Sequence, residues 1–595
     1  MPQAYKKDRK PQSVPKKDIK IIAKPIPWYR NEYIIGFILA AIAFILYANT
    51  FKNDYALDDY FAITTNKLVK EGFQGIPNLL RTDFWQSADK NLGYYRPLSL
   101  ITFAIEFQFF GLSPHISHFI NVLLYALTVF CLFKLLRKLF PDSNILFSTI
   151  ITLLFAAHPL HTELVANIKG RDELLSFLAI ILMLCFNLRF IDTGKIVWMA
   201  FSLISLYLGL LSKESAFVGI ALLPLVAYYY KKTSIGALFK LCLPFVAVFA
   251  LFFIQKTLLL GNSAASVPKD LIFYPYFQPE IRYASSFMLF LYYFRMLLFP
   301  HPLLYDYGFN QLPGVQWDNI QALAGLLLFL AIVTIGVYYA WKKKPMGFAI
   351  LFFYITIAPA IGFVLLRGGI FAERLLYASS FGFCIAVMLL LDRVLQTRFI
   401  SNAAPRIAKP GQLPLLIGVS AIAFIGFSYK TITRNHDWKD NFTLVSADQK
   451  AGSNSAQNHY QYGMLLIDKA NTGPRLANRD SLLKAGIVPL KLAVKMVPNF
   501  ADAYFRLGFA YELLMETNPS RTTVDTALLY FTRATETGPT MSSAFIHLGH
   551  INNWLRNYDK SLQYYSRALD LDPGNEAIKA KLNEIIEAQK QLGLK

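Results

Sequence analysis

Two adjacent carboxylates, Asp58 and Asp59, lie among aromatic and aliphatic residues in the segment "YALDDYFAITTN" (55–66). This segment follows the first apolar run of the chain, at the point where a membrane exit is expected. Acids at membrane depth usually have a function, whereas acids just beyond it also begin external loops or cap helices. Neighbouring like charges push their pKa values apart, which suits two different roles. The pair is therefore a candidate functional site, with a simple loop or cap as the alternative.

Other predicted outer turns also combine cations with acids beside apolar runs. These turns are "YYRPLSL" (94–100), "HPLHTELVANIKGRDELL" (158–175), "LSKES" (211–215) and "RGGIFAERLLYASS" (367–380). Charges in such places are costly unless they are paired or used. The charged residues of interest are Arg96, Glu163, Arg171, Asp172, Lys213, Glu214, Glu373 and Arg374. Together they predict a polar cavity open to the outer leaflet, although the four acids could also be salt-bridge partners of the nearby cations.

Two histidines in the longest of these turns have the spacing of half a metal site. His158 and His161 are followed by Glu163. Pro159 interrupts the helix that would align the two imidazoles, and the sequence fixes no third ligand. The spacing therefore favours a structural or hydrogen-bonding role over metal binding. No cofactor is predicted with certainty, and a divalent metal stays open.

The composition excludes an ordinary soluble protein. Of the 595 residues, 55% are hydrophobic and only 16% are charged, whereas soluble domains carry about 25% charged residues. The net charge of +21 comes from Lys and Arg clusters that adjoin apolar runs. This is the positive-inside pattern of membrane proteins, so we do not expect a nucleic-acid partner. All 4 cysteines fall in apolar runs, which predicts no disulfide framework.

Runs long enough to cross a bilayer, about 17 to 25 residues, predict roughly eleven membrane spans. They lie near residues 33–50, 117–137, 145–162, 173–190, 196–211, 214–230, 237–256, 320–340, 347–366, 374–391 and 413–429. A further run at 282–300 contains Arg282 and Arg295. We expect it to lie at the outer interface or dip into it rather than to cross.

The charge pattern predicts the orientation and the domains. We expect a basic cytoplasmic tail over 1–32, a membrane domain over 33–430 with a large first outer loop at 51–116, and an extracytoplasmic domain over 431–595. The basic segments 342–344 and 393–410 are expected inside, and the loop 301–319, which lacks Lys and Arg, outside. An odd number of spans then puts the two ends of the chain on opposite sides.

The C-terminal region contains a helical repeat. Aligning "ADAYFRLGFAY" (501–511) with "SSAFIHLGHIN" (542–552) matches Gly508 with Gly549, and an earlier, looser unit contains Gly463. Small residues at the packing point, and Pro at the end of each repeat, resemble a tetratricopeptide (TPR) array. We expect about three repeats and a terminal helix. Such an α-solenoid normally presents a concave surface to a peptide or protein.

Six ordered segments resemble a known family over nearly the whole chain. They are "LDDYFAITTN", "YYRPLSLITFAIEFQFFGLSPHISHFINVLLYAL", "LFAAHPLHTELVANIKGRDELL", "LLSKES", "FAERLLYASSFGF" and "RNHDWKDNFTLV". Followed by TPRs, they are similar to the TMTC family, transmembrane TPR-containing proteins of the GT-C glycosyltransferase class. The resemblance implies an all-α fold with a GT-C-like membrane helix bundle and a C-terminal TPR α-solenoid.

The resemblance also implies a reaction. Animal members are implicated in O-mannosylation of proteins in the endoplasmic reticulum from dolichyl-phosphate mannose. For this compact chain the analogous expectation is a polyprenyl-phosphate sugar donor in a bacterial inner membrane and an acceptor protein held by the TPR array. Asp58 or Asp59 would be the general base towards a Ser or Thr hydroxyl, with inversion at the sugar carbon. The developing phosphate charge would be bound by Arg96, Arg171, Lys213 and Arg374.

Two other functions remain alternatives. A non-enzymatic membrane-anchored TPR scaffold for envelope proteins would explain the repeats but not the charges in separate outer turns. A lipid or solute transporter would need charges along a path to both faces, whereas the predicted charges gather on one side. We therefore rank the glycosyltransferase first and the transporter last.

Overall fold

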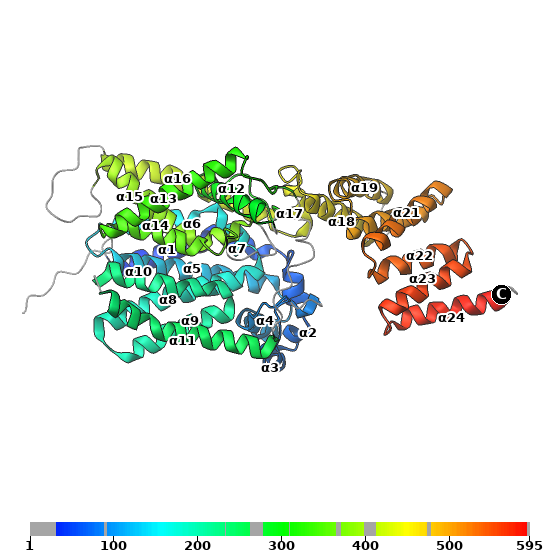
Figure 1. Cartoon of the computed structure of the whole chain (residues 1–595), viewed down its shortest axis with the longest axis horizontal. Coiled ribbons are helices and arrows are strands. Elements are labelled where there is room, and N and C mark those ends of the chain that lie inside the picture. The colour runs from blue at the N-terminus through cyan, green and yellow to red at the C-terminus, as the bar shows by residue number, and fades with distance from the viewer. Residues whose placement is uncertain are drawn as a thin grey trace, which may run out of the picture.

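The structure is a computed structural model that describes residues 31–88, 92–231, 234–261, 278–308, 310–363, 371–397, 412–472 and 478–591. It consists of a bundle of long helices and an array of shorter helices that extends from one end of the bundle (Figure 1). The described residues contain no β-strand, and the predicted all-helical fold is confirmed. Nearly all of the predicted basic tail and most of the basic segment 393–410 lie outside the described residues.

Each predicted membrane span corresponds to a helix of the bundle. In chain order these helices are α1 (Glu32–Tyr47), α5 (Pro114–Leu139), α6 (Ile145–Ala157), α8 (Arg171–Thr193), α9 (Ile196–Ser212), α10 (Val218–Lys231), α11 (Ile235–Leu260), α13 (Ile320–Trp341), α14 (Pro345–Ile357), α15 (Tyr377–Leu395) and α16 (Gln412–Asp437). Among the described helices, 7 are long and apolar enough to cross a membrane, or 8 if α6 and the bent segment after it form one span. The expected number of about eleven spans is reached only if the shorter helices α9, α10 and α14, which lie beside the long ones, are also counted as spans.

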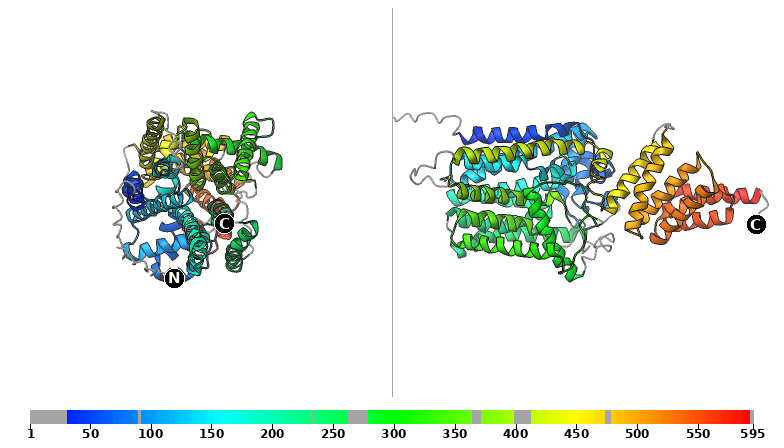
Figure 2. Two further views of the ribbon diagram at one scale, coloured as in Figure 1. Left: turned by 90° about the vertical axis from the view of Figure 1, so that its left-hand side faces the viewer. Right: turned by 90° about the horizontal axis from the view of Figure 1, so that it is seen from above.

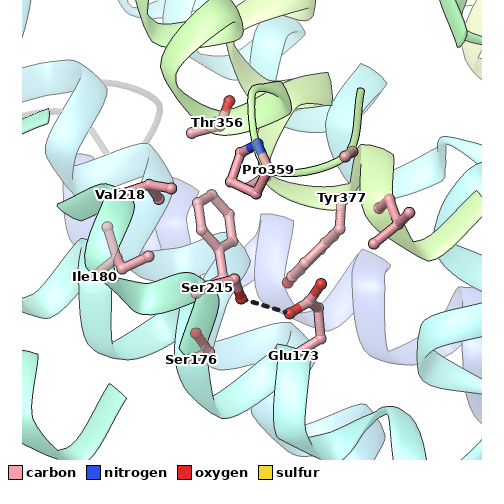
Figure 3. A pocket seen from close by; sticks show the side chains of 12 residues that line it. Glu173, Ser176, Ile180, Ser215, Val218, Thr356, Pro359 and Tyr377 are labelled. Atoms are coloured by element: carbon pink, nitrogen blue, oxygen red, sulfur yellow. Dashed lines mark hydrogen bonds between the residues drawn. The ribbon is translucent and has the colours of Figure 1, made fainter. Parts of the chain in front are cut away.

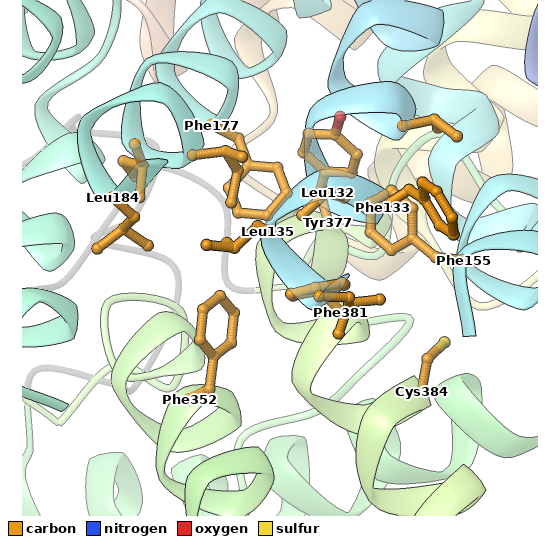
Figure 4. Close-up of a cluster of buried hydrophobic side chains, with 14 of the residues drawn as sticks. Leu132, Phe133, Leu135, Phe155, Phe177, Leu184, Phe352, Tyr377, Phe381 and Cys384 are labelled. Carbon is orange, nitrogen blue, oxygen red and sulfur yellow. The ribbon is translucent and has the colours of Figure 1, made fainter. Parts of the chain in front are cut away.

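Aromatic side chains fill the space between the central helices. Phe155 of α6, Phe177 of α8, Phe352 of α14 and Phe381 of α15 are buried in one cluster with Tyr377 (Figure 4). The rings of Phe177 and Tyr377 meet edge to face at 5.0 Å, an arrangement that aromatic pairs prefer. This packing fixes the ends of the helices from which the charged turns emerge.

The helix α12 (Pro279–Leu298) does not run the length of the bundle. It crosses the first turns of α13, where a Cβ added at Gly325 would lie 2.0 Å from the carbonyl oxygen of Phe287. Near its start, Arg282 donates hydrogen bonds to the carbonyls of residues 362 and 363, which follow α14, and near its end the carbonyl of Leu297 bonds to His158 after α6. Both ends of α12 thus lie at the same end of the bundle. This arrangement fits the expectation that the run 282–300 does not cross the membrane.

The first predicted outer loop is folded. It contains the short helices η2 (Ala48–Lys52), α2 (Lys67–Lys70) and α3 (Ile76–Leu79), and then α4 (Pro97–Phe110). Its own apolar cluster includes Tyr55, Phe84 and Phe103 together with Ile168 from the segment before α8. These elements lie at the end of the bundle that carries the C-terminal array, whereas α1 begins at the other end (Figure 2). We call these the array end and the opposite end.

The C-terminal array begins with α17 (Asn441–Asp448) and continues with helix pairs. The pairs are α18 (Ala456–Thr472) with α19 (Arg479–Met496), α20 (Ala501–Met515) with α21 (Arg521–Thr537), and α22 (Ser542–Trp554) with α23 (Tyr558–Leu571), followed by α24 (Glu576–Gln591). The aligned glycines allow close contact within each pair. A Cβ at Gly463, Gly508 or Gly549 would lie 2.6 to 2.9 Å from a side chain of the partner helix. The repeat alignment thus identified the packing points.

Candidate active site

The two adjacent acids occupy different environments. Asp59 is fully buried, and its carboxylate accepts hydrogen bonds from the backbone N–H groups of Ala56 (2.9 Å) and Lys169 (2.7 Å). The Asp58 side chain is 40% exposed, and one of its carboxylate oxygens lies 4.0 Å from Nζ of Lys169. Asp59 therefore fastens its loop to the segment before α8, while Asp58 stays accessible.

The protonation of Asp59 reflects this difference. Burial raises the pKa of the Asp59 carboxyl to about 7, and the nearby charge of Asp58 acts in the same direction. The two backbone N–H donors favour the ionised form and oppose the rise. Because both oxygens of Asp59 already accept bonds from the protein, Asp58 is the better candidate for contact with a bound molecule.

The loop that carries the acids is held by residues from the start of the C-terminal region. Leu57, just before Asp58, has a φ of 50°, a left-handed conformation that is unfavourable for a branched side chain. Its N–H donates to Oδ1 of Asn441 at 2.7 Å, and the N–H of Asp54 donates to the carbonyl of Lys439 at 2.8 Å. Strained backbone of this kind persists only where its surroundings impose it.

Asp172 is the centre of a buried ion-pair network. One of its carboxylate oxygens lies 2.9 Å from Arg96 and 3.4 Å from Lys169, and the other lies 3.8 Å from Lys213. Arg96 also donates to Glu214 at 2.9 Å. Buried charges require partners of this kind, and the network gathers three cations from separate turns at the array end.

Arg374 enters the same region from the turn before α15. Its guanidinium pairs with Glu163, and its backbone N–H donates to the other carboxylate oxygen of Glu163 at 2.8 Å. Arg374 also interacts electrostatically with Asp58 and Asp172. Its side chain is 33% exposed, whereas the side chains of the other predicted phosphate-binding cations are at most 9% exposed. Arg374 is thus the most accessible of these cations.

Arg171 points away from this network. Its guanidinium pairs with Glu106 and donates to Oδ1 of Asn121 at 2.7 Å and to the carbonyl of Ser117 at 2.9 Å. The side chain is fully buried. These contacts tie the start of α8 to α4 and α5, so the structure does not bring Arg171 together with the other predicted cations.

Both predicted histidines have hydrogen-bond partners inside the bundle. His158 bonds through Nε2 to the carbonyl of Leu297 (3.1 Å). His161 bonds through Nδ1 to the hydroxyl of Tyr125 (2.8 Å) and through Nε2 to the hydroxyl of Ser380 (2.9 Å). These contacts fit the hydrogen-bonding role favoured by the sequence. In the part of the chain that the structure describes, no three His, Cys, Asp or Glu residues form a metal-binding group.

Glu373 organises a neighbouring loop at the array end instead of pairing with Arg374. Its Oε1 accepts hydrogen bonds from the N–H of Leu304 (2.6 Å) and the hydroxyl of Tyr307 (2.7 Å). In the same loop, the N–H of Tyr305 donates to Asp448 of α17 at 2.7 Å. The loop 303–308 is therefore held between the membrane bundle and the C-terminal region.

A buried ion pair connects α16 to α17 at this junction. The two terminal nitrogens of Arg434 lie 2.5 and 2.9 Å from the two oxygens of Asp448. A second acid, Asp437, lies 3.1 Å from Arg434 but is 36% exposed. The carboxylate of Asp306 accepts a hydrogen bond from Ser455 at 3.3 Å, and burial raises its pKa to about 6. The junction joins α16, the loop 303–308 and the start of the array.

A narrow cleft of about 40 Å³ lies beside the ion-pair network between α8, α10, α14 and α15 (Figure 3). Glu173 and Ser215 form its polar side: the Ser215 hydroxyl donates to Glu173 at 3.2 Å, and Lys213 lies 3.2 Å from the same acid. The facing wall is apolar and includes Ile180, Val218 and Pro359. The cleft thus combines a charged rim with an apolar lining.

Sequence reasoning did not single out several of these residues. Lys169 and Glu173 stand out as charges of the turn 158–175, but the sequence does not show which charges face one another and so gives these two no role. Asn441, Arg434 and Asp448 lie in or near "RNHDWKDNFTLV", which entered only through the family resemblance. The contact of Asn441 with Leu57 spans 384 residues and that of Asp448 with Tyr305 spans 143 residues, whereas Arg434 and Asp448 are 14 residues apart.

The long apolar helices, the ion-pair network at one end and the helical array together define an integral membrane protein with a helical-repeat domain. No family model matches its sequence. The chain is nevertheless related over most of its length to proteins named protein O-mannosyl-transferases.

Three of these relatives illustrate the similarity. Human TMTC1 is 25% identical over 529 residues, which cover 79% of this chain and 56% of the relative. Human TMTC3 is 25% identical over 629 residues, covering 91% and 64%, and Drosophila melanogaster Tmtc1 is 24% identical over 575 residues, covering 79% and 62%. The chain thus matches less than two thirds of the length of each of these relatives.

Proposed function

We propose that this protein is a GT-C-type membrane glycosyltransferase. It would transfer a mannose-like hexose from a polyprenyl-phosphate donor to Ser or Thr hydroxyls of extracytoplasmic proteins. The observation that carries the proposal is the accessible carboxylate of Asp58, beside Lys169 and within the field of Arg374, at one end of a membrane bundle. The names of the relatives support the reaction class.

Asp58 is the proposed general base. A Ser or Thr hydroxyl is a poor nucleophile, and a carboxylate in hydrogen-bonding reach accepts its proton as the new bond to the anomeric carbon forms. The bond between that carbon and the phosphate oxygen breaks, and the lipid phosphate departs with the electron pair. Attack from the face opposite the phosphate inverts the configuration. Asp59 would hold the loop in place through its two backbone hydrogen bonds.

Fixed cations would stabilise the departing phosphate. Arg374 is the preferred contact because it is the most accessible of the predicted cations. Lys213 and Arg96, held by buried acids, would add positive potential without rearranging during the reaction. Arg171 is omitted because its donors are already used inside the bundle.

The helical array would hold the acceptor polypeptide close to Asp58. The first helix of its helix pairs, α18, contacts the membrane part directly, since the hydroxyl of Tyr305 donates to Asn458 at 3.2 Å. A polypeptide bound along the array would therefore begin near the site, which favours transfer by proximity. In this proposal the N-terminus is cytoplasmic, the membrane is a bacterial inner membrane and the array is periplasmic.

Comparative glycoproteomics tests the function. Envelope proteins from cells with and without the gene are compared by mass spectrometry, and cells lacking it are complemented with the wild-type or the Asp58→Asn gene. We expect hexose-modified Ser or Thr sites that disappear without the gene and return only with the wild-type copy. Modification that is unchanged in the deletion strain, or restored by the variant, would rule out the proposal.

A positioning role for Asn441 follows from the same loop. Asn441→Ala removes the acceptor for the Leu57 N–H, so the strained turn that presents Asp58 is expected to relax. We expect kcat to fall about tenfold, since misplacement by roughly 1 Å costs one to two orders of magnitude. KM for the donor should stay unchanged. Steady-state transfer to a peptide acceptor from a polyprenyl-phosphate sugar measures both constants.

Two further variants separate positioning from general damage. Asn441→Asp keeps an oxygen acceptor and should retain kcat. Thr443→Ala is the matched control on α17, because the Thr443 hydroxyl makes no hydrogen bond to any described residue. Equal losses in the alanine and aspartate variants would contradict the positioning role.

A further inference from the structure

A second cleft, of about 560 Å³, lies at the opposite end of the bundle from Asp58. It is formed by the turn between α13 and α14 and by the last turn of α15. Its charged lining residues are Lys342, Lys344, Arg393 and Asp392, and Tyr338 and Tyr339 also line it. Three cations against one acid give this cleft a formal charge of +2 (3 − 1).

The cations of this cleft are not ion-paired with described carboxylates, in contrast to their neighbours. Nζ of Lys342 donates to the hydroxyl of Tyr338 at 2.5 Å, and Arg393 donates to the hydroxyl of Tyr339. The carboxylate of Asp392 accepts from the hydroxyl of Thr397 at 2.6 Å.

Other cations at the same end of the bundle do form ion pairs. Lys134 and Arg137 pair with Glu32, and Lys138 and Lys231 pair with Asp192. Lys and Arg carry several N–H donors each, so the cleft cations that bond to tyrosine retain donors for an anion.

The position of the cleft indicates where that anion comes from. The apolar helix α13 ends here with exposed aromatic residues: Tyr338 is 47% and Trp341 is 79% exposed. Tyr and Trp at the end of a membrane span mark the headgroup level of the bilayer. The cleft therefore lies where lipid phosphates are concentrated, and basic pockets between membrane helices suit acidic headgroups.

We propose that this cleft binds the phosphate of an acidic phospholipid, such as phosphatidylglycerol. Lys342, Lys344 and Arg393 would donate hydrogen bonds to the phosphate oxygens, with the glycerol and acyl chains lying along the apolar surface of α13. The site is separate from the proposed sugar-transfer site and does not depend on it.

Lipid binding to the purified full-length chain tests this proposal. Native mass spectrometry compares retention of phosphatidylglycerol and phosphatidylcholine by the wild type and by a K342Q/K344Q/R393Q variant. We expect the wild type to retain phosphatidylglycerol at least about tenfold more strongly, and the variant to lose that preference. Equal retention of both lipids by the wild type, or an undiminished preference in the variant, would overturn the proposal.

Two controls make the result specific. Lys195 precedes α9 at the same end of the bundle as Lys138 and Lys231. A K138Q/K195Q/K231Q variant therefore removes the same amount of charge outside the cleft, and should keep the preference within twofold. Inorganic phosphate at the concentration of the lipid should not displace phosphatidylglycerol from the wild type. Full displacement by inorganic phosphate would mean that the cleft binds a soluble phosphate. If the control variant lost the preference for phosphatidylglycerol as much as the cleft variant, the preference would come from general surface charge and the proposal would be overturned.

Discussion

Replacing Asp58 with Asn is expected to lower the rate of sugar transfer by about 10²- to 10⁴-fold, the usual contribution of a general base. A carboxamide has nearly the same size as a carboxylate but cannot accept the hydroxyl proton. The Asp58 side chain is 40% exposed, and Lys169, its partner at 4.0 Å, keeps its closer pair with Asp172 at 3.4 Å. Folding and membrane insertion should therefore be preserved. The measurement is single-turnover transfer from a polyprenyl-phosphate sugar to a peptide, with donor binding determined separately.

Asp59→Asn is the matched comparison for this variant. The N–H groups of Ala56 and Lys169 donate to different oxygens of Asp59. The amide of Asn has only one oxygen, so one of these N–H groups would face the NH₂ group instead of an acceptor. We expect this variant to lower the unfolding temperature as well as the rate. If Asp59→Asn reduced transfer without loss of stability while Asp58→Asn retained full activity, the roles assigned to the two acids would have to be exchanged.

Asp448→Ala is expected to destabilise the junction between the membrane bundle and the array by about 3 to 5 kcal/mol, the usual cost of breaking a buried ion pair. The change leaves Arg434 buried without its bidentate partner and removes the acceptor for the Tyr305 N–H. The loops around residues 57 and 305 should then become sensitive to protease. Thermal unfolding in detergent and limited proteolysis would measure the effect.

The second acid beside Arg434 provides the control. Asp437 is 36% exposed and lies 3.1 Å from the same guanidinium, so Asp437→Ala should cost no more than about 1 kcal/mol. Similar unfolding temperatures for the two variants would show that the Arg434–Asp448 pair does not hold the junction together.

The fold was largely predictable because its main signal is local. Each apolar run of membrane length corresponds to a helix, since a helix is the form in which such a run satisfies its own backbone. Gly508 and Gly549 marked the packing points of the repeats because a side chain there would collide with the partner helix. The two arginines in the run 282–300 predicted that α12 would differ from the membrane spans, and α12 is not among the described helices that are long and apolar enough to cross a membrane.

The arrangement of the site was less predictable because it depends on distant contacts. The difference between Asp58 and Asp59 comes from two distant contacts. The N–H of Lys169 bonds to Asp59 from 110 residues away, and the side chain of Asn441 bonds to Leu57 from 384 residues away. Local direction also matters: successive residues of a helix are turned by about 100°, so Arg171 and Asp172 point to different neighbours. Their shared motif did not reveal that only Asp172 joins the cation network.

The junction at Asn441 and Asp448 has a consequence for how such a protein can diversify. In a solenoid each repeat touches only its neighbours, so only the helices nearest the bundle are constrained by the chemistry in the membrane. The helices beyond α19 have no such constraint from the loop that presents Asp58. Under the proposed function, selection could exchange or multiply these distal modules and so alter which acceptor polypeptides the array holds. The proximal segment would have to co-evolve with the bundle.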